Sequence, residues 1–517
     1  MKKLSLLFLS ALLCGLSHAE IKMPSVFSDN MLLQRDMLVK VWGKADANAC
    51  IDVAFGGQKK STKADASGNW SLKLDKMVAN KNPQEMTVSE NGKVGKVIKN
   101  ILVGEVWIAG GQSNMKWSIY ATTEYKNFAD RAKYPTIRYF NQNTCTLAKE
   151  PAFDCPKYSS WVSIENPKKF ASFSAVGLYF AERLTKDLDV PVGIVFTALG
   201  ASKMICWLPE EKIAKLPYLQ KEWKKFQEGM ATYDYQKAHA KWKKDVVAWE
   251  EEKNQAKAQN KAFDKKQPFE PDPLSCLDLK YQTPVYLYNG VVAPLAGYGA
   301  RGVIWYQGES DSYGETLSNF QAQFGLILEA WREKFENPKL HFIHSQLAPL
   351  GKGHAWPMTR WQQYLCSKNF KRVSVVCIAD TGEKDDVHPR DKHIVGDRFA
   401  KLALEKVYGK KVGGLAPEVK KVSYKKDTAV VQFNTYGYAL VGKGEPRGFE
   451  VRVNGKWCKA KATLSGNSVV VKSLTGENVE AVRYLWCVWS KPEAWLFSKN
   501  GLPAFSFTHP LNLTSIL

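Results

Sequence analysis

The chain has 517 residues, too many for one ordinary hydrophobic core, so we expect two to four domains. Apolar residues make up 45% and charged residues 24%, which excludes an intrinsically disordered chain and indicates a folded protein. The formal net charge of +22 suits acidic partners, but no nucleic-acid-binding motif accompanies it. A solvated, lysine-rich surface is therefore the favoured explanation of the charge, and we predict no nucleic-acid partner.

The first 19 residues have the pattern of a secretory signal peptide. Lys2 and Lys3 precede an apolar run that ends in small residues at Ala19. The run is too short to cross a membrane, and no later stretch is long and apolar enough to do so. We predict cleavage after Ala19, no transmembrane segment, and a periplasmic or secreted protein.

Short β-type runs alternate with turns between residues 20 and 100. The runs cover residues 39–42, 51–55, 70–74 and 86–89. Gly-Gly, Ser-Gly and Asn-Gly pairs separate them, which is typical of turns between strands. We predict a β-sandwich-like N-terminal domain over residues 20–100 that serves as a scaffold.

From Gly104 onward, apolar runs alternate with segments of helical periodicity. The apolar runs cover residues 106–109, 192–199, 302–306, 340–346 and 373–379. The helical segments cover residues 174–188, 315–335 and 391–407. This alternation predicts buried parallel strands in a three-layer α/β domain over residues 101–412, with reactive groups at the carboxyl ends of the strands.

Two further segments depart from this alternation. Residues 209–282 are rich in Lys, Glu, Ala and Gln, and we interpret them as a helical insertion. From residue 413 to 517 the β character returns, in runs at 429–433, 448–453, 468–471 and 481–489. We predict a C-terminal β-domain there.

A candidate nucleophile follows the first apolar run of the α/β domain, in the stretch GEVWIAGGQSNM of residues 104–115. Gly110 and Gly111 permit a sharp turn that exposes Ser113 at the start of the next element. Unpaired amides at a helix N-terminus can stabilise an oxyanion. A turn whose serine merely caps a helix is the alternative.

A candidate base lies in the loop after residues 373–379, in the segment DDVHP of residues 385–389. A carboxylate two or three residues before a histidine can orient one ring nitrogen, which leaves the other free to accept a proton from serine. Either Asp385 or Asp386 can serve, and the three-residue spacing favours Asp385. A solvated Asp-rich turn is the alternative for the motif, and His354 is an alternative base to His388.

A third group follows residues 302–306, in the segment QGESD of residues 307–311. Gln307 offers an amide donor to an oxyanion, and Gly200, which follows another strand, offers a backbone amide. Glu309 permits a different chemistry, because paired with Asp385 or Asp386 it would form the acid and base of a glycosidase. Substrate-binding candidates beside these groups are Gln112, Asn114 and Glu309.

Several ordered motifs resemble the sialate O-acetylesterase family of the SGNH-type hydrolases. They are GEVWIAGGQSNM, FSAVGLYFAERL, LYNGVVAPLAGYGARGVIWYQGESD, DVHP, VRYLW and NGLPAFSF. The resemblance extends over nearly the whole chain beyond residue 19. It implies a flavodoxin-like catalytic domain and a serine esterase that removes O-acetyl groups from sugars.

The resemblance also implies roles for individual residues. Ser113 would be the nucleophile and His388 the base, and the amides of Ser113 and Gly200 would form the oxyanion hole with Gln307. The third triad member stays ambiguous, because the family favours the position of Asp386 and the broader SGNH class that of Asp385. No metal or organic cofactor is implied, and the cysteines show no CxxC metal spacing.

The substrate class and two other functions stay open. Anionic sialic acid would fit the basic charge, but a neutral acetylated polysaccharide fits a secreted esterase equally well. A glycoside hydrolase would use Glu309 with Asp385 or Asp386, and a noncatalytic glycan-binding protein would use the aromatic and basic residues. Oligomeric state and disulfide pairing cannot be read from the sequence.

Overall fold

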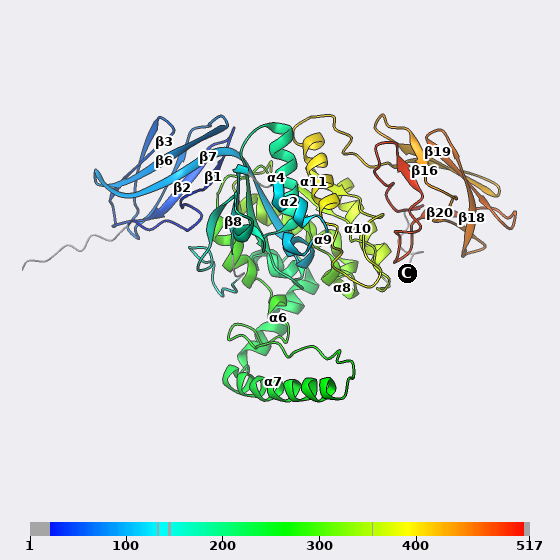
Figure 1. Cartoon of the computed structure of the whole chain (residues 1–517), viewed down its shortest axis with the longest axis horizontal. Coiled ribbons are helices and arrows are strands. Elements are labelled where there is room, and N and C mark those ends of the chain that lie inside the picture. Colours follow the sequence, from blue (N-terminus) through cyan, green and yellow to red (C-terminus); the bar gives the residue numbers. More distant parts are fainter. Residues whose placement is uncertain (1–20, 132–133, 143–145, 354, 511–517) are drawn as a thin grey trace, which may run out of the picture.

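A computed structural model describes residues 21–131, 134–142, 146–353 and 355–510 (Figure 1). The predicted signal peptide and His354 lie outside these residues. A mixed α/β region occupies the middle of the molecule, with β-rich regions at its two ends (Figure 1). Within the described residues, no helix combines the length and the apolar character needed to cross a membrane.

Seven strands build the N-terminal β-rich region. They are β1 (Leu32–Gln34), β2 (Val39–Lys44), β3 (Cys50–Phe55), β4 (Gln58–Lys63), β5 (Asn69–Leu74), β6 (Asn80–Glu90) and the first half of β7 (Lys93–Gly111). Buried and exposed residues alternate strictly along β5, which is typical of an antiparallel strand with one face on a core. The four predicted β-type runs fall within β2, β3, β5 and β6.

The 19-residue strand β7 joins this region to the α/β region. Its first half pairs antiparallel with β6, and its second half pairs parallel with β10 and β11. The predicted domain boundary near residue 100 therefore falls inside a strand. At the junction, a Cβ on Gly104 would lie 2.0 Å from the backbone oxygen of Pro191, so only glycine fits there.

The carboxylate of Glu105 closes this junction and is fully buried. Arg35 Nε lies 2.5 Å from Glu105 Oε1, and Arg301 Nε lies 2.8 Å from Glu105 Oε2. Burial by itself raises the pKa of Glu105, but the two guanidinium groups outweigh it, so the pKa lies below its ordinary value. The carboxylate is therefore ionised and binds the N-terminal region to the α/β region.

The sheet of the α/β region has the order β9-β8-β10-β7-β11-β12-β13. Its strands besides β7 are β8 (Tyr134–Asn141), β9 (Ser160–Ile164), β10 (Val192–Ala198), β11 (Gly302–Tyr306), β12 (His341–Ser345) and β13 (Val373–Val376). Every neighbouring pair is parallel except β8 with β9. The prediction of buried parallel strands is thus confirmed, while β8 and β9 were not predicted.

Helices cover both faces of this sheet. Trp107 and Ala109 share a hydrophobic cluster with α4 (Ala175–Leu188) and α11 (His393–Lys406). Val106 and Ile108 share another cluster with α9 (Phe320–Lys334). Because both faces are covered, the strands are continuously apolar. Shorter helices of this region are α1 (Ser113–Lys116), α2 (Tyr125–Arg131), α3 (Pro167–Phe170) and α8 (Gly314–Ser318).

The predicted insertion forms helices that project from the α/β region (Figure 1). They are α5 (Glu210–Ile213), α6 (Pro217–Ala231) and α7 (Tyr235–Ala258). Helix α6 buries Tyr218, Leu219 and Phe226, whereas α7 has no buried residue. Of the two long helices, α6 is therefore anchored to the protein by an apolar face and α7 is not.

The C-terminal region consists of strands. They are β14 (Glu418–Lys425), β15 (Thr428–Asn434), β16 (Leu440–Gly442), β17 (Phe449–Val453), β18 (Lys456–Ser465), β19 (Ser468–Ser473), β20 (Ala481–Tyr484), β21 (Leu496–Ser498) and β22 (Phe507–His509). The region packs on α10 (Trp356–Asn369), where Trp361 and Tyr364 join its hydrophobic cluster. The buried Arg360 donates to Ser490 Oγ at 2.9 Å and fixes this contact.

Candidate active site

The turn after β7 presents Ser113. Gly111 has a φ of 129°, and a Cβ there would lie 2.2 Å from the backbone oxygen of Tyr306, so the position requires glycine. The chain then enters α1, whose N-cap is Gln112 and whose first residue is Ser113. Ser113 is half-buried and is not the capping residue.

Gly200 lies beside this turn. In the register of β10 with β7, Ala198 lies opposite Gly111, and the backbone N–H of Leu199 donates to the oxygen of Gly111 at 3.1 Å. A Cβ on Gly200 would lie 3.5 Å from the Cβ of Ser113. The structure thus brings these two predicted site residues together.

Gln307 follows β11, which pairs with β7 on the other side. The Gln307 amide nitrogen donates to Asp311 and, at 3.4 Å, to the backbone oxygen of Ser202. Its amide oxygen has no hydrogen-bond partner among the described residues. Because the amide nitrogen already has acceptors, the oxyanion role of Gln307 stays a prediction. The neighbouring Gly308 N–H donates to Gln112 Oε1 at 3.2 Å and fixes the side chain of Gln112 between the two strands.

His388 lies in the loop before α11 and is held beside Asp386. The backbone N–H of His388 donates to Asp386 Oδ1 at 2.8 Å, and the same oxygen lies 3.8 Å from His388 Nδ1. The indole of Trp117 stacks on the imidazole, with centroids 4.9 Å apart. Nε2 of His388 is buried and has no hydrogen-bond partner among the described residues. Asp386, rather than Asp385, is thus the carboxylate found at the ring.

The surroundings of His388 favour its neutral form. Burial lowers its pKa, the charge of Lys392 lowers it further, and Asp386 partly compensates. The pKa therefore lies below the ordinary histidine value. A neutral imidazole at pH 7 can accept a proton, as a general base must.

A buried cluster of Asn114, Glu309 and Lys392 links the turn of Ser113 to the loop of His388. Asn114 Nδ2 donates to Glu309 Oε1 at 2.5 Å and to the backbone oxygen of Val387 at 3.0 Å. Lys392 Nζ donates to Asn114 Oδ1 at 2.5 Å. Because Asn114 follows Ser113 and Val387 precedes His388, these bonds hold the two predicted reactive segments next to each other.

The charges of this buried cluster are strongly perturbed. Lys392 is fully buried, and burial lowers its pKa to about 7 although Glu309 opposes that shift. Burial raises the pKa of Glu309, and the bond from Asn114 opposes it. Burial also raises the pKa of the nearby Asp311 to about 6. Neither Lys392 nor Trp117 was predicted as a site residue.

The C-terminal region supports the loop that carries His388. Val387 and Val488 pack against a small cluster that contains Leu347 and Trp356. Lys491 Nζ donates to the backbone oxygen of Gly382 at 3.0 Å, at the start of the same loop. Among the residues that the structure describes, no group of three or more His, Cys, Asp or Glu could hold a metal ion.

Comparison with known proteins gives consistent matches. A family profile described as "carbohydrate esterase, sialic acid-specific acetylesterase" matches residues 103–247 and 278–405, more than half of the chain. The human sialate O-acetylesterase is 24% identical over 90% of this chain and 87% of its own length. The rat sialate O-acetylesterase is 24% identical over 94% of this chain and 93% of its own.

A similar solved structure is that of a carbohydrate acetylesterase from Xanthomonas citri. It has 26% sequence identity and a TM-score of 0.78, and the match covers 95% of this chain and 100% of that one. The family profile passes over residues 248–277, which include the C-terminal half of α7.

Proposed function

Because the chain belongs to the family of sialic acid-specific acetylesterases among the carbohydrate esterases, and is a carbohydrate O-acetylesterase, we propose that it works as a serine esterase through an acetyl-enzyme intermediate. The observation that carries the proposal is the bond from Asn114 to the backbone oxygen of Val387, because it joins the segments of Ser113 and His388. The position of Gly200, where an added Cβ would lie 3.5 Å from the Cβ of Ser113, supports its backbone amide as a second donor to the oxyanion.

Acylation begins with proton transfer from Ser113 Oγ to His388 Nε2 as Oγ attacks the acetyl carbonyl carbon. The amides of Ser113 and Gly200, with Gln307, stabilise the negative charge on the former carbonyl oxygen. The intermediate collapses when the bond from the acetyl carbon to the sugar oxygen breaks. His388 returns its proton to that oxygen, and the sugar leaves with a free hydroxyl group.

Deacylation repeats these steps with water. His388 Nε2 takes a proton from water as the water oxygen attacks the acetyl carbon. The bond from Ser113 Oγ to that carbon then breaks, Oγ regains a proton from His388, and acetate leaves. Asp386 orients the imidazole and stabilises its protonated form in both halves of the reaction. Its bond to the backbone of His388 favours it over Asp385 for this role.

The order β10-β7-β11-β12-β13 supports assignment of the α/β region to the flavodoxin-like SGNH class, since it corresponds to the strand order 2-1-3-4-5. Residues 101–412 would form the catalytic domain, with the insertion at 209–282, between β-domains at 20–100 and 413–517. A periplasmic or secreted location is part of the same proposal.

The substrates proposed are O-acetylated sialic acid or an O-acetylated polysaccharide, both consistent with the names of the relatives. The glycosidase alternative is less consistent with the contacts of Glu309. One of its carboxylate oxygens accepts a bond from Asn114, and the other is buried. A glycosidase acid needs a carboxyl group that reaches the glycosidic oxygen.

The central test is Ser113→Ala, assayed by acetate release from 4-nitrophenyl acetate, O-acetylated sialic acid and acetylated xylan. We expect kcat/KM to fall by about 10³-fold or more, because the nucleophile is lost. Labelling by a fluorophosphonate should disappear as well. The matched control is Ser172→Ala, which changes an exposed serine and should keep both activity and labelling. Wild-type activity of Ser113→Ala would refute the proposal.

A further inference from the structure

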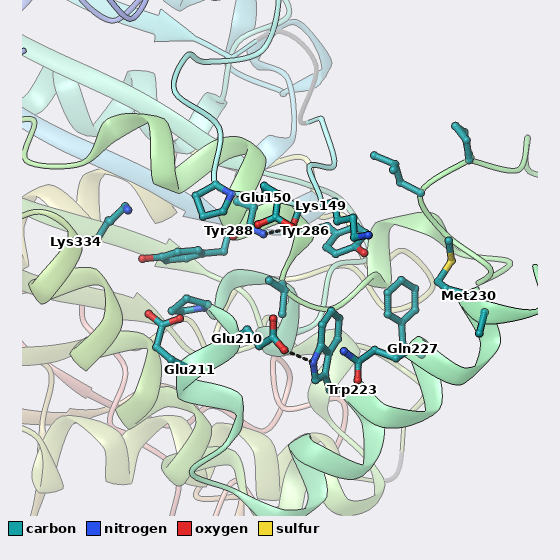
Figure 2. Close-up of a pocket in the computed structure, with 18 residues that line it drawn as sticks. Lys149, Glu150, Glu210, Glu211, Trp223, Gln227, Met230, Tyr286, Tyr288 and Lys334 are labelled. Carbon is teal, nitrogen blue, oxygen red and sulfur yellow. Dashed lines mark hydrogen bonds between the residues drawn. The ribbon is translucent and has the colours of Figure 1, made fainter. Parts of the chain in front are cut away.

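A cavity of about 730 Å³ lies between the insertion and the α/β region (Figure 2). Its lining comes from α5, α6, the segment at residues 149–151, the segment at 285–289 and the end of α9. Neither Ser113 nor His388 is among the lining residues. The cavity is thus separate from the proposed catalytic residues, and its volume suits a small ligand, for which pockets measure roughly 300–1,000 Å³.

Aromatic rings held in fixed positions form one side of this cavity. Trp223 projects from α6 and donates through Nε1 to Glu210 Oε1 at 2.9 Å (Figure 2). Its ring stacks on Phe226 with centroids 5.5 Å apart and meets the edge of Tyr286 at 6.2 Å. Phe226 and Tyr286 are buried, whereas Trp223 stays half-exposed. A fixed, partly open indole presents an apolar ring beside a polar handle, which suits a ligand that is itself apolar on one face.

Polar groups that suit hydroxyls surround the rings. Glu150, Glu210 and Glu211 bring carboxylates, and Gln227 brings an amide, all on exposed side chains. Carboxylates accept hydrogen bonds, and the amide both donates and accepts. Sugars combine an apolar face of C–H groups with hydroxyls around the ring edge, so they match rings and planar polar groups together.

The charges of the lining favour an uncharged ligand over an anionic one. Among the described residues that line the cavity, three carboxylates accompany two amines, those of Lys149 and Lys334. Burial lowers the pKa of Lys334, and the charge of Glu211 opposes that shift. A cavity with an excess of carboxylates repels a polyanion, although the whole chain has a formal net charge of +22.

The cavity is also within reach of the proposed catalytic residues along one segment of chain. Gly200 lies beside Ser113, since an added Cβ would be 3.5 Å from the Cβ of Ser113, and Pro209 lines the cavity. The nine steps between them include the 3₁₀ turn of Met204–Trp207. At about 3.5 Å per extended residue and about 2 Å per residue in the turn, the two points lie about 25 Å apart or less. A short oligosaccharide spans such a distance.

We propose that this cavity binds unacetylated, uncharged sugar units of a polysaccharide whose acetylated unit occupies the catalytic site. The inference rests on the proposed function and deepens it, because it names a neutral polymer as the substrate. The insertion then contributes to substrate binding through α6.

Binding tests the inference without turnover. The probes are xylohexaose, cellohexaose and mannohexaose, with hexagalacturonate as the anionic comparison, each titrated calorimetrically into the full chain. We expect at least one neutral hexasaccharide to bind, and Trp223→Ala to weaken its binding about tenfold through loss of the stacking surface. Trp249→Ala, which removes a tryptophan of α7 outside the cavity, should bind as the wild type does. Ser113→Ala should also keep this binding, so failure of the cavity and failure of the esterase mechanism give different results.

Kinetics provide a second measurement. With acetylated xylan or acetylated glucomannan, Trp223→Ala should raise KM about tenfold and leave kcat within about twofold. Hydrolysis of 4-nitrophenyl acetate should not change. If Trp223→Ala fails to fold, Glu211→Ala and Gln227→Ala alter exposed side chains of the same cavity, and each should raise KM about threefold. Absence of binding by every neutral hexasaccharide, tighter binding of hexagalacturonate, or unchanged KM values would overturn the inference.

Discussion

Two polar groups at the same edge of the sheet differ in how far water reaches them. Asp386 and His388, the open pair, have side chains that are 45% and 27% exposed. In the buried cluster of Asn114, Glu309 and Lys392, Lys392 is fully buried. We expect the open pair to react with a substrate and the buried cluster to hold the reactive segments in place. The comparison predicts that reactivity and positioning come from separate groups, and substitutions can remove each of them by itself.

The largest effect should come from the open pair. We expect His388→Ala to lower kcat/KM for 4-nitrophenyl acetate by about 10³-fold or more, because no base remains to accept the serine proton. The melting temperature should stay within about 2 °C, since a half-exposed side chain contributes little to stability. His239→Ala, in α7, is the matched control and should behave as the wild type. A fall in kcat/KM of less than tenfold for His388→Ala would contradict the prediction that the open pair is the reactive group.

The two aspartates before His388 should differ by a wide margin. We expect Asp386→Asn to lower kcat about 10²-fold and Asp385→Asn by less than about threefold, because only Asp386 contacts the histidine in the described structure. Asp386 raises the pKa of His388, so its loss should shift the acid limb of the kcat/KM profile to lower pH. Equal losses in the two variants would contradict the assignment.

Lys392→Met tests whether the buried cluster acts on the histidine. Steady-state kinetics should show kcat about tenfold lower, because Asn114 loses the bond that orients it. The charge of Lys392 lowers the pKa of His388, so the acid limb of the profile should move to higher pH, which a purely structural role would not cause. Lys401→Met, which removes a lysine of α11 paired with Asp397, is the matched control.

A double variant separates charge from packing in the same cluster. Glu309→Gln combined with Lys392→Met removes both ionisable groups of the cluster, so neither remains buried without its partner. We expect it to melt at a higher temperature than Lys392→Met alone. An acid limb that stays in place for Lys392→Met would show that the cluster acts only on geometry.

The smallest effect on activity should come from Asp311→Asn, which we expect to stay within about threefold. The main effect of Asp311→Asn should be on the pH dependence of folding stability. The pKa of Asp311 is about 6 in the folded protein and near 3.8 for an ordinary aspartate, so between these values the folded protein holds a proton that the unfolded chain has released. This contribution is complete below pH 4 and is lost as the pH rises through 6.

The melting temperature of Asp311→Asn minus that of the wild type should therefore increase from pH 4 to pH 7. The pKa difference corresponds to about 3 kcal/mol at most. Asp75→Asn, which changes an exposed carboxylate, should show no such trend. A difference in melting temperature that does not change with pH would mean that folding does not raise the pKa of Asp311.

The open pair was within reach of sequence reasoning. Of the buried cluster, Asn114 and Glu309 were named as substrate-binding candidates, whereas Lys392 was not predicted. His388 and its aspartates stand together in five residues after an apolar strand, so their spacing alone suggests a role. Lys392 is four residues further on, in a charged turn that looks solvated. Lys392 binds Asn114, 278 residues away in the sequence, and Asn114 in turn binds Glu309. A local pattern cannot report such a contact.

The prediction of strands from the sequence was limited in the same way. Continuous apolar runs predicted β10, β11, β12 and β13, because strands with both faces covered have no polar alternation. The polar β4 was missed, since none of its residues is buried and it is held by its pairing with β3. The predicted boundary near residue 100 falls inside β7, which runs from Lys93 to Gly111.

Because β7 is continuous, the protein cannot be truncated near residue 100 without loss of part of this strand. A shortened protein that begins at residue 101 would keep Ser113 but would lose the first eight residues of β7, together with β6 and Arg35. Glu105 would then retain only one of its two guanidinium partners. The N-terminal region therefore cannot be treated as a removable tag, because the strand that ends at the nucleophile is anchored at its other end in that region.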